Sequence, residues 1–113
     1  MVTLKVKNIK EAEESVREEI MNKCEEKLPF FEDLFKKYDK DLILEVIIDK
    51  SSALYKVSAS INMKSKKILV AEEDKDAVKA ITKLLSEFKK VVKKQYELER
   101  KDYEYKRKRN KKK

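Results

Sequence analysis

The chain contains no glycine at any of its 113 positions, and this absence limits both its turns and its chemistry. Glycine lets a backbone approach a phosphate closely, so neither a P-loop nor a dinucleotide-binding loop can be written in this sequence. Histidine is absent as well, which removes the commonest general base, the usual ligand of catalytic zinc and every nucleophile that is paired with histidine. We therefore expect a protein that is not an enzyme and that holds no metal and no cofactor.

The length is that of one domain with one modest core. Its single cysteine, Cys24, falls on the apolar face of a predicted helix and is expected to be a reduced core residue. The first five residues lack the apolar segment of a signal peptide, and no apolar run approaches the ~18 residues of a membrane span. We expect a cytoplasmic protein with neither a membrane nor a small molecule among its partners.

The first part of the chain predicts a strand followed by a helix. Apolar residues alternate with polar ones over residues 2–7, and they then recur every four positions from Ala12 to Leu28, which predicts a helix of about four turns. Pro29 is expected to end or kink this helix, because proline lacks the N–H and crowds the preceding turn. A short second helical piece is predicted after the proline, over residues 30–38, before a polar connection that ends at residue 41.

Three β segments and a long helix follow. Residues 42–49 and 55–63 alternate between apolar and polar side chains, and a short strand over 68–70 comes after a turn at 64–66. Acidic residues at 72–76 precede a helix that runs from about Lys75 to beyond Leu98; we interpret them as helix caps and not as a metal cluster. The order β-α-β-β-β-α predicts an α+β sandwich, a four-stranded sheet with two helices packed on one face.

The positive charge is concentrated in the second half of the chain. The 30 Lys and Arg residues exceed the 22 Asp and Glu residues, a net charge of +8, which indicates a polyanionic partner. Residues 1–49 carry 9 basic and 13 acidic side chains, a net of −4, whereas residues 50–113 carry 21 and 9, a net of +12. We therefore expect the binding surface in the second half.

The last helix separates its apolar residues from its lysines. At about 100° per residue, Val78, Ile81, Leu84, Leu85, Phe88, Val91 and Val92 form one stripe. Nearly opposite lies a basic ridge, which we define as Lys75, Lys79, Lys83, Lys90, Lys93 and Lys94. Ordinary solvated faces mix charges through i,i+4 pairs, but Glu87 is the only acid between Ala77 and Tyr96. The alternative is that these lysines form an ordinary solvated face and reflect a general bias toward lysine in the chain. The acidic first helix argues against such a uniform bias in composition.

Residues 100–113 are expected to form a basic, flexible tail beyond a domain that spans residues 1–99. Seven of the last nine residues are basic and none is acidic, as in polyanion-binding arms. We assign Arg100, Lys101, Arg107 and Arg109 to RNA binding; a nuclear-localisation signal and a plain solubilising tail are the alternatives.

Residues 68–81, with the following Leu84, Phe88 and Lys94, resemble the ribosome hibernation-promoting factors. This family is also called ribosome-associated inhibitor A or sigma-54 modulation protein. Residues 15–18 and Lys23 in the first helix resemble the family's pattern too, so that the resemblance covers about residues 1–98. The chain departs from the family at Asp74 and in the turn at 64–66, where members often carry glycine, and at Val78 and Val91. It resembles the short form, without the second domain that long members use to pair ribosomes.

The resemblance implies binding to the small ribosomal subunit, in the channel between its head and body. There the protein would exclude mRNA and the tRNAs of the A and P sites, and would keep idle ribosomes of the bacterial 70S type intact in stress or stationary phase. Carried over by position, Arg17 and Lys23 of the first helix and Lys79, Lys83, Lys90 and Lys94 of the last would face 16S-type rRNA. We expect a monomer away from the ribosome.

Two alternatives of other kinds fit the same residues. A free-standing double-stranded-RNA-binding domain shares the α-β-β-β-α core, although such domains cluster their lysines at the start of the last helix. A protein-interaction module would place the basic ridge against an acidic partner, and its binding would survive treatment with RNase.

Overall fold

The computed structural model describes the backbone of residues 1–111 and the side chains of residues 1–101. Its elements, in chain order, are β1 (Val2–Lys7), the 3-10 turn η1 (Ile9–Glu11), α1 (Glu14–Leu34), β2 (Leu42–Ser51), β3 (Leu54–Asn62), β4 (Lys67–Asp74) and α2 (Ala77–Lys111). The predicted order β-α-β-β-β-α is confirmed.

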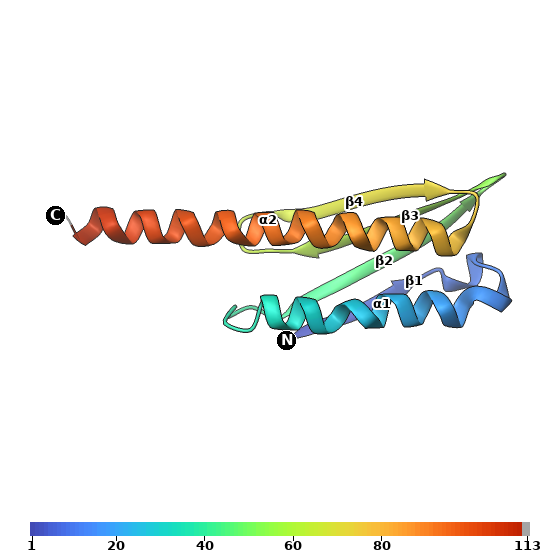
Figure 1. The fold of residues 1–113 in the computed structure, drawn as a ribbon, viewed down its shortest axis with the longest axis horizontal. Coiled ribbons are helices and arrows are strands. Elements are labelled where there is room, and N and C mark those ends of the chain that lie inside the picture. The colour runs from blue at the N-terminus through green and yellow to red at the C-terminus, as the bar shows by residue number, and fades with distance from the viewer. Residues whose placement is uncertain (112–113) are drawn as a thin grey trace.

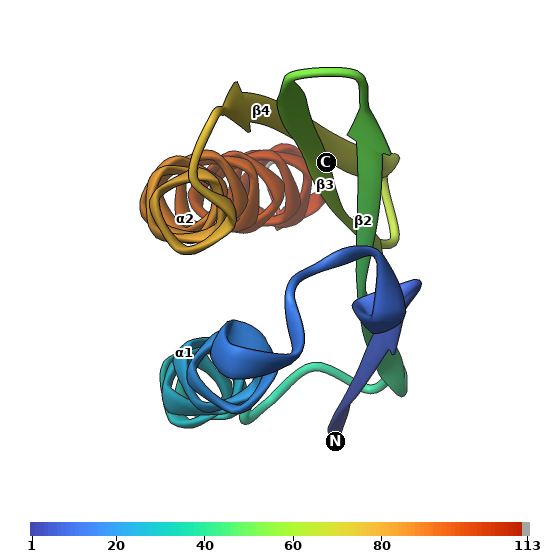
Figure 2. The same cartoon turned by 90° about the vertical axis from the view of Figure 1, so that its right-hand side faces the viewer.

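The strands form one mixed sheet in the order β1-β2-β3-β4. β1 runs parallel to β2, while β2, β3 and β4 are joined by two antiparallel pairings. Both helices cover the same face of this sheet, α1 beside β1 and α2 beside β3 and β4 (Figures 1 and 2). The predicted α+β sandwich, with two helices on one face, is therefore confirmed.

The core lies between the sheet and the two helices, and strand periodicity places it there. Leu42, Leu44, Val46 and Ile48 alternate along β2 and are all buried. The intervening side chains point to the other face, where Ile43 is 54% exposed. The two helices meet through Phe31 of α1 and Phe88 of α2, two fully buried rings whose centroids lie 5.8 Å apart.

Pro29 does not end the first helix, so that part of the prediction is wrong. α1 continues through it to Leu34; of the separate helical piece predicted over residues 30–38, residues 30–34 are the last part of the same helix and residues 35–38 lie beyond it. Proline leaves the carbonyl four residues earlier without its N–H partner, but Pro29 lies on the exposed side, where water can satisfy that carbonyl. Burial of Phe31 within α1 and of Phe35 directly after it stabilises the helix beyond Pro29.

The connection from β1 to α1 contains a turn that the sequence pattern did not predict. Asn8 adopts the left-handed conformation, with φ 61° and ψ 34°, and η1 follows it. Arg17 then holds this connection: its Nε donates to the carbonyl of Ala12 at 2.9 Å, and its Nη2 donates to that of Lys10 at 3.0 Å. Three residues are too few for a periodic signal, which is why the turn escaped prediction.

The far end of α2 is attached to the rest of the fold through Glu99. The carboxylate of Glu99 accepts hydrogen bonds from the hydroxyl of Tyr38 at 2.6 Å and from the backbone N–H of Ser65 at 3.1 Å. The Ser65 hydroxyl also contacts Glu99 and accepts a hydrogen bond from Gln95 at 2.8 Å. We call Tyr38, Ser65, Gln95 and Glu99 the polar clamp. It joins α2 to the β3–β4 hairpin and to the segment between α1 and β2.

Beyond the polar clamp, α2 projects past the sheet, and the molecule measures 61 Å along its longest axis (Figure 1). The backbone of α2 continues to Lys111, within the segment for which a flexible tail is expected. The side chains of Arg107 and Arg109 lie outside the described residues, and the division at residue 99 stays a prediction. Within the described part of the chain, no helix combines the length and the apolar character of a membrane span.

Candidate nucleic-acid interface

Of the acidic residues at 72–76, only Asp76 caps α2, because Glu72, Glu73 and Asp74 belong to β4. Asp76 Oδ1 accepts hydrogen bonds from the backbone N–H groups of Val78 at 2.9 Å and Lys79 at 3.1 Å. Asp74 Oδ1 accepts a hydrogen bond from the N–H of Asp76 at 2.9 Å, which fixes the turn that leads out of β4. The two bonds to Asp76 satisfy N–H groups that have no partner within the helix, so the prediction of a cap is met at Asp76 and is wrong for Glu72 and Glu73.

The structure places the whole basic ridge on the surface. All six lysines are exposed: five lie on α2, and Lys75 lies in the turn just before it. The opposite side of α2 is buried against the sheet and α1, with Ile81, Leu84 and Phe88 completely inaccessible. Because that side is packed, the ridge has one fixed direction, and its helical part from Lys79 to Lys94 spans about 22 Å.

One ridge lysine has an acidic partner. Lys83 Nζ lies 2.7 Å from Asp74 Oδ2, and this contact raises the pKa of Lys83 and lowers that of Asp74. Among the side chains of residues 1–101, the other ridge lysines form no ion pair within the molecule. Lys79–Lys83 and Lys90–Lys94 are like-charge pairs at i,i+4 spacing, and each costs helix stability of about 0.2–0.5 kcal/mol in isolation. An external anion beside the ridge would relieve this repulsion.

The two predicted residues of α1 differ in their availability. The guanidinium of Arg17 is bound to the backbone of the β1–α1 connection, as described above, and it is half-buried. Lys23 is half-buried too, and it lies on the stripe of α1 that includes Lys27 and Phe30. The structure therefore places Lys23 on the side of the molecule that the helices form, whereas Arg17 stabilises the β1–α1 connection.

Sequence reasoning missed two cations beside the ridge, Lys89 and Lys27. Lys89 Nζ lies 4.5 Å from the centre of the Phe30 ring, a cation–π contact that carries positive charge across the border between α2 and α1. Lys27 lies on α1 three positions before Phe30, on the same side of that helix, and it is half-buried. On the helical wheel Lys89 falls between the basic ridge and the apolar stripe. Its place at the border with α1 could be predicted only if the position of α1 beside α2 were known.

The last described turn of α2 extends the positive charge. Arg100 and Lys101 are both exposed, at the point where α2 leaves the polar clamp. The helix thus presents lysines from its start to the limit of its described side chains. Such an arrangement suits contacts to successive phosphates, which position a protein on nucleic acid without reading the bases.

Comparisons with known proteins support the same fold. No protein-family model matches the chain, and no curated protein matches it in sequence. Among solved structures, the N-terminal domain of Protein Y from Thermus thermophilus matches with 18% identity and a TM-score of 0.56, over 83% of this chain and 98% of that one. The chain shares the fold of this domain. A ribosomal subunit interface protein from Coxiella burnetii matches with 14% identity and a TM-score of 0.55, over 82% of this chain and 93% of that one.

Both of these neighbours are hibernation-promoting factors, so the resemblance seen in the sequence is confirmed for the fold. At identities this low, a structural likeness carries the architecture alone. What the chain binds must be argued from its own surface.

Proposed function

We propose that the protein is a ribosome hibernation factor that binds the small ribosomal subunit. In this proposal it occupies the channel for mRNA and for the tRNAs of the A and P sites, and keeps idle 70S-type ribosomes intact in the cytoplasm. The observation that carries the proposal is the basic ridge: a row of exposed lysines on one rigid helix of a fold shared with Protein Y.

The mechanism that follows is steric and electrostatic. Lysine ammonium groups fixed along α2 would neutralise phosphates of 16S-type rRNA and release counterions, so that affinity falls steeply as salt rises. Recognition would depend on the shape of the RNA and on its phosphate positions, because lysines on a ridge do not read base edges. Inhibition then requires only that the folded domain fills the space that mRNA and tRNA need, without any catalytic residue.

A triple charge reversal on the ridge tests this proposal. Lys79→Glu, Lys90→Glu and Lys94→Glu change exposed side chains that have no ion pair among residues 1–101, and Lys83 is left intact because it binds Asp74. We expect the variant to fold normally and to lose co-sedimentation with small subunits. A matched control reverses Lys5, Lys56 and Lys67, which are also exposed but lie on the strands.

Binding is measured by co-sedimentation with 30S, 50S and 70S particles at two salt concentrations. The control variant should bind as the unchanged protein does, and bound protein should compete with tRNA and mRNA for the small subunit. If both variants lost small-subunit binding to the same extent, the ridge would contribute only through its share of the net charge, and its position on α2 would not matter. Preference for isolated RNA duplexes over small subunits would favour the double-stranded-RNA-binding alternative, and binding that survives RNase would favour an acidic protein partner.

A further inference from the structure

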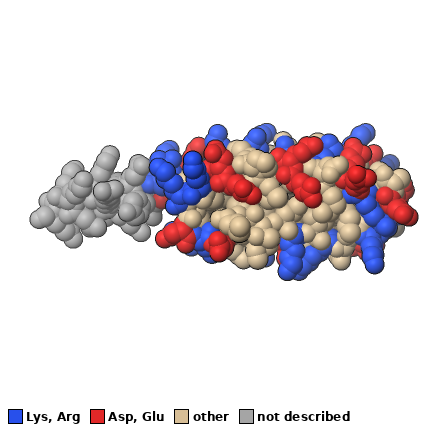
Figure 3. Space-filling view, turned by 90° about the horizontal axis from the view of Figure 1, so that it is seen from below, with Lys and Arg blue, Asp and Glu red and all other residues tan. Residues whose placement is uncertain are grey.

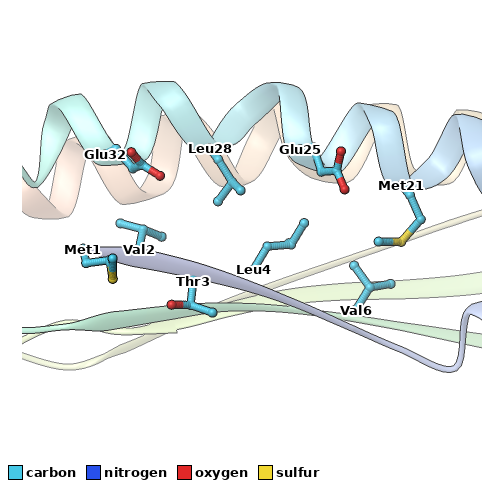
Figure 4. Close-up of a pocket in the computed structure, with 9 residues that line it drawn as sticks. All are labelled: Met1, Val2, Thr3, Leu4, Val6, Met21, Glu25, Leu28 and Glu32. Carbon is cyan, nitrogen blue, oxygen red and sulfur yellow. The ribbon is translucent and has the colours of Figure 1, made fainter.

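A shallow groove of about 560 Å³ lies between β1 and α1 (Figure 4), and none of the basic-ridge lysines lines it. Its floor includes Leu4 and Val6 of β1, which are only partly buried. Its wall on α1 consists of Met21, Glu25, Leu28 and Glu32. Figure 3 views the molecule from this side and shows uncharged surface in the middle of the described part, bordered by acidic and basic groups.

β1 is an edge strand, and its free edge opens beside this groove. Within the described backbone, residues 1–111, it pairs with β2 alone. The carbonyl of Met1 accepts a hydrogen bond from the N–H of Leu42 at 3.0 Å, so that the backbone groups of Met1 point toward β2. Because these directions alternate along a strand, the N–H and C=O groups of Val2, Leu4 and Val6 point to the unpaired side. They can pair with one more strand.

The wall on α1 matches an added strand in length and in chemistry. Its four residues follow the spacing i, i+4, i+7 and i+11, which keeps them on one side of the helix. They span about 16 Å, the length of about five residues of extended chain. Along this wall an apolar side chain alternates with a carboxylate, so a strand laid beside β1 would meet Met21 and Leu28 as well as Glu25 and Glu32.

We propose that this groove binds an extended peptide from a partner protein, which adds a fifth strand beside β1. The side chains that face α1 are alternately basic and apolar: lysine or arginine meets Glu25 and Glu32, and an apolar residue packs on Leu28. Backbone pairing supplies affinity and the alternate side chains supply specificity, as in other cases of strand addition. A second copy of this chain is disfavoured, because pairing two β1 edges would bring two acidic α1 walls together.

The proposal is independent of RNA binding, because the groove and the ridge share no residue. It gives the molecule two separate surfaces of opposite character. The basic ridge suits phosphates, and the acidic, apolar groove suits a basic segment of protein.

The test uses the full chain and a fluorescent, end-capped hexapeptide, Lys-Thr-Leu-Thr-Lys-Thr, with a Glu-Thr-Leu-Thr-Glu-Thr peptide as the comparison. Fluorescence anisotropy should detect binding of the basic peptide only. Glu25→Lys with Glu32→Lys should weaken binding about tenfold, or more. The matched control, Glu19→Lys with Glu26→Lys, reverses two exposed carboxylates of α1 that do not line the groove and should leave the dissociation constant unchanged.

Backbone pairing is tested on the peptide, which avoids any risk to folding. In the bound peptide, the backbone N–H groups of every second residue point toward β1. N-methylation of these residues should abolish binding, whereas N-methylation of the others should be tolerated. Amide exchange at Leu4 of the protein should slow when the unmodified peptide binds. Equal loss in both charge-reversal pairs, or indifference to N-methylation, would overturn the proposal. So would absence of binding, or a dimer detected by sedimentation whose formation excludes the peptide.

Discussion

Burial of Cys24 in the core determines the acidity and the reactivity of its thiol. The thiol lies in the core with no accessible surface, as the sequence pattern predicted. Burial raises its pKa from the ordinary value of 9.0 to about 11, with a smaller contribution from the charge of Glu25. The reactive thiolate is therefore scarce at neutral pH.

We predict that alkylating reagents modify Cys24 only when the protein unfolds. The folded state also keeps its thiol proton to higher pH than the unfolded state does, so this group's contribution to stability is complete below pH 9 and is lost as pH rises toward about 11. Iodoacetamide labelling with and without denaturant checks the first statement. Cys24→Ala should remove the thiol's part of the pH dependence; equal slopes in both proteins would contradict the assignment.

Asn8 gives a second prediction at the scale of one residue. Its left-handed conformation is accessible to asparagine and glycine but is strained for alanine. Asn8→Ala should lower the free energy of unfolding by about 1 kcal/mol, whereas Asn8→Gly should leave it nearly unchanged. Denaturation in urea measures both. Equal destabilisation by the two substitutions would show that the side chain matters and the backbone conformation does not.

Among the elements, those with many repeats of one period were predictable, and those decided by contacts from elsewhere were not. β3 alternates over its whole length, and the sequence located it to within one residue at each end. α1 was predicted to end or kink at Pro29, because local propensity cannot include the burial of Phe31 against Phe88, which continues the helix to Leu34. The exposure of the ridge lysines was predictable because they repeat with the period of a helix. The ion pair of Lys83 was not, because it depends on where the end of β4 places Asp74.

Tyr38 is the member of the polar clamp that joins α2 to the segment between α1 and β2. The hydroxyl of Tyr38 donates to Glu99 and accepts a hydrogen bond from the N–H of Lys64 at 2.8 Å; burial and the bond to Glu99 raise its pKa. Tyr38→Phe should lower the free energy of unfolding by about 1–2 kcal/mol and speed amide exchange around Gln95.

Tyr96→Phe is the matched control for this substitution. Its ring packs on Phe35, with centroids 5.5 Å apart, but its hydroxyl forms no hydrogen bond with the described side chains or backbone. The control should therefore change stability and exchange little. If both variants exchange alike, the clamp contributes packing and no specific hydrogen bond.

At the scale of the whole molecule, the net charge of +8 is the sum of an acidic first half and a basic second half, and neither half carries that charge. The acidic first half supplies α1 with the carboxylates of the groove, and the basic second half supplies the ridge. The fold keeps these surfaces apart because each helix packs its own apolar stripe on the sheet. The sequence predicted the ridge from one helix, but the groove needs the edge position of β1, which only the strand order reveals.

The segment after the polar clamp yields the last prediction, which rests on the proposed binding to ribosomal RNA. Deleting residues 104–113 removes seven basic side chains and one acidic one, while every buried core residue among the side chains of residues 1–101 lies at or before Val92. The midpoint of thermal unfolding should therefore stay the same, whereas affinity for small subunits should fall. The slope of log K against log salt should become shallower by about 0.7–0.9 for each phosphate that the shortened chain no longer neutralises. A lower affinity with an unchanged slope would assign the segment a role without ion pairing, and an unchanged affinity would confine RNA binding to the ridge.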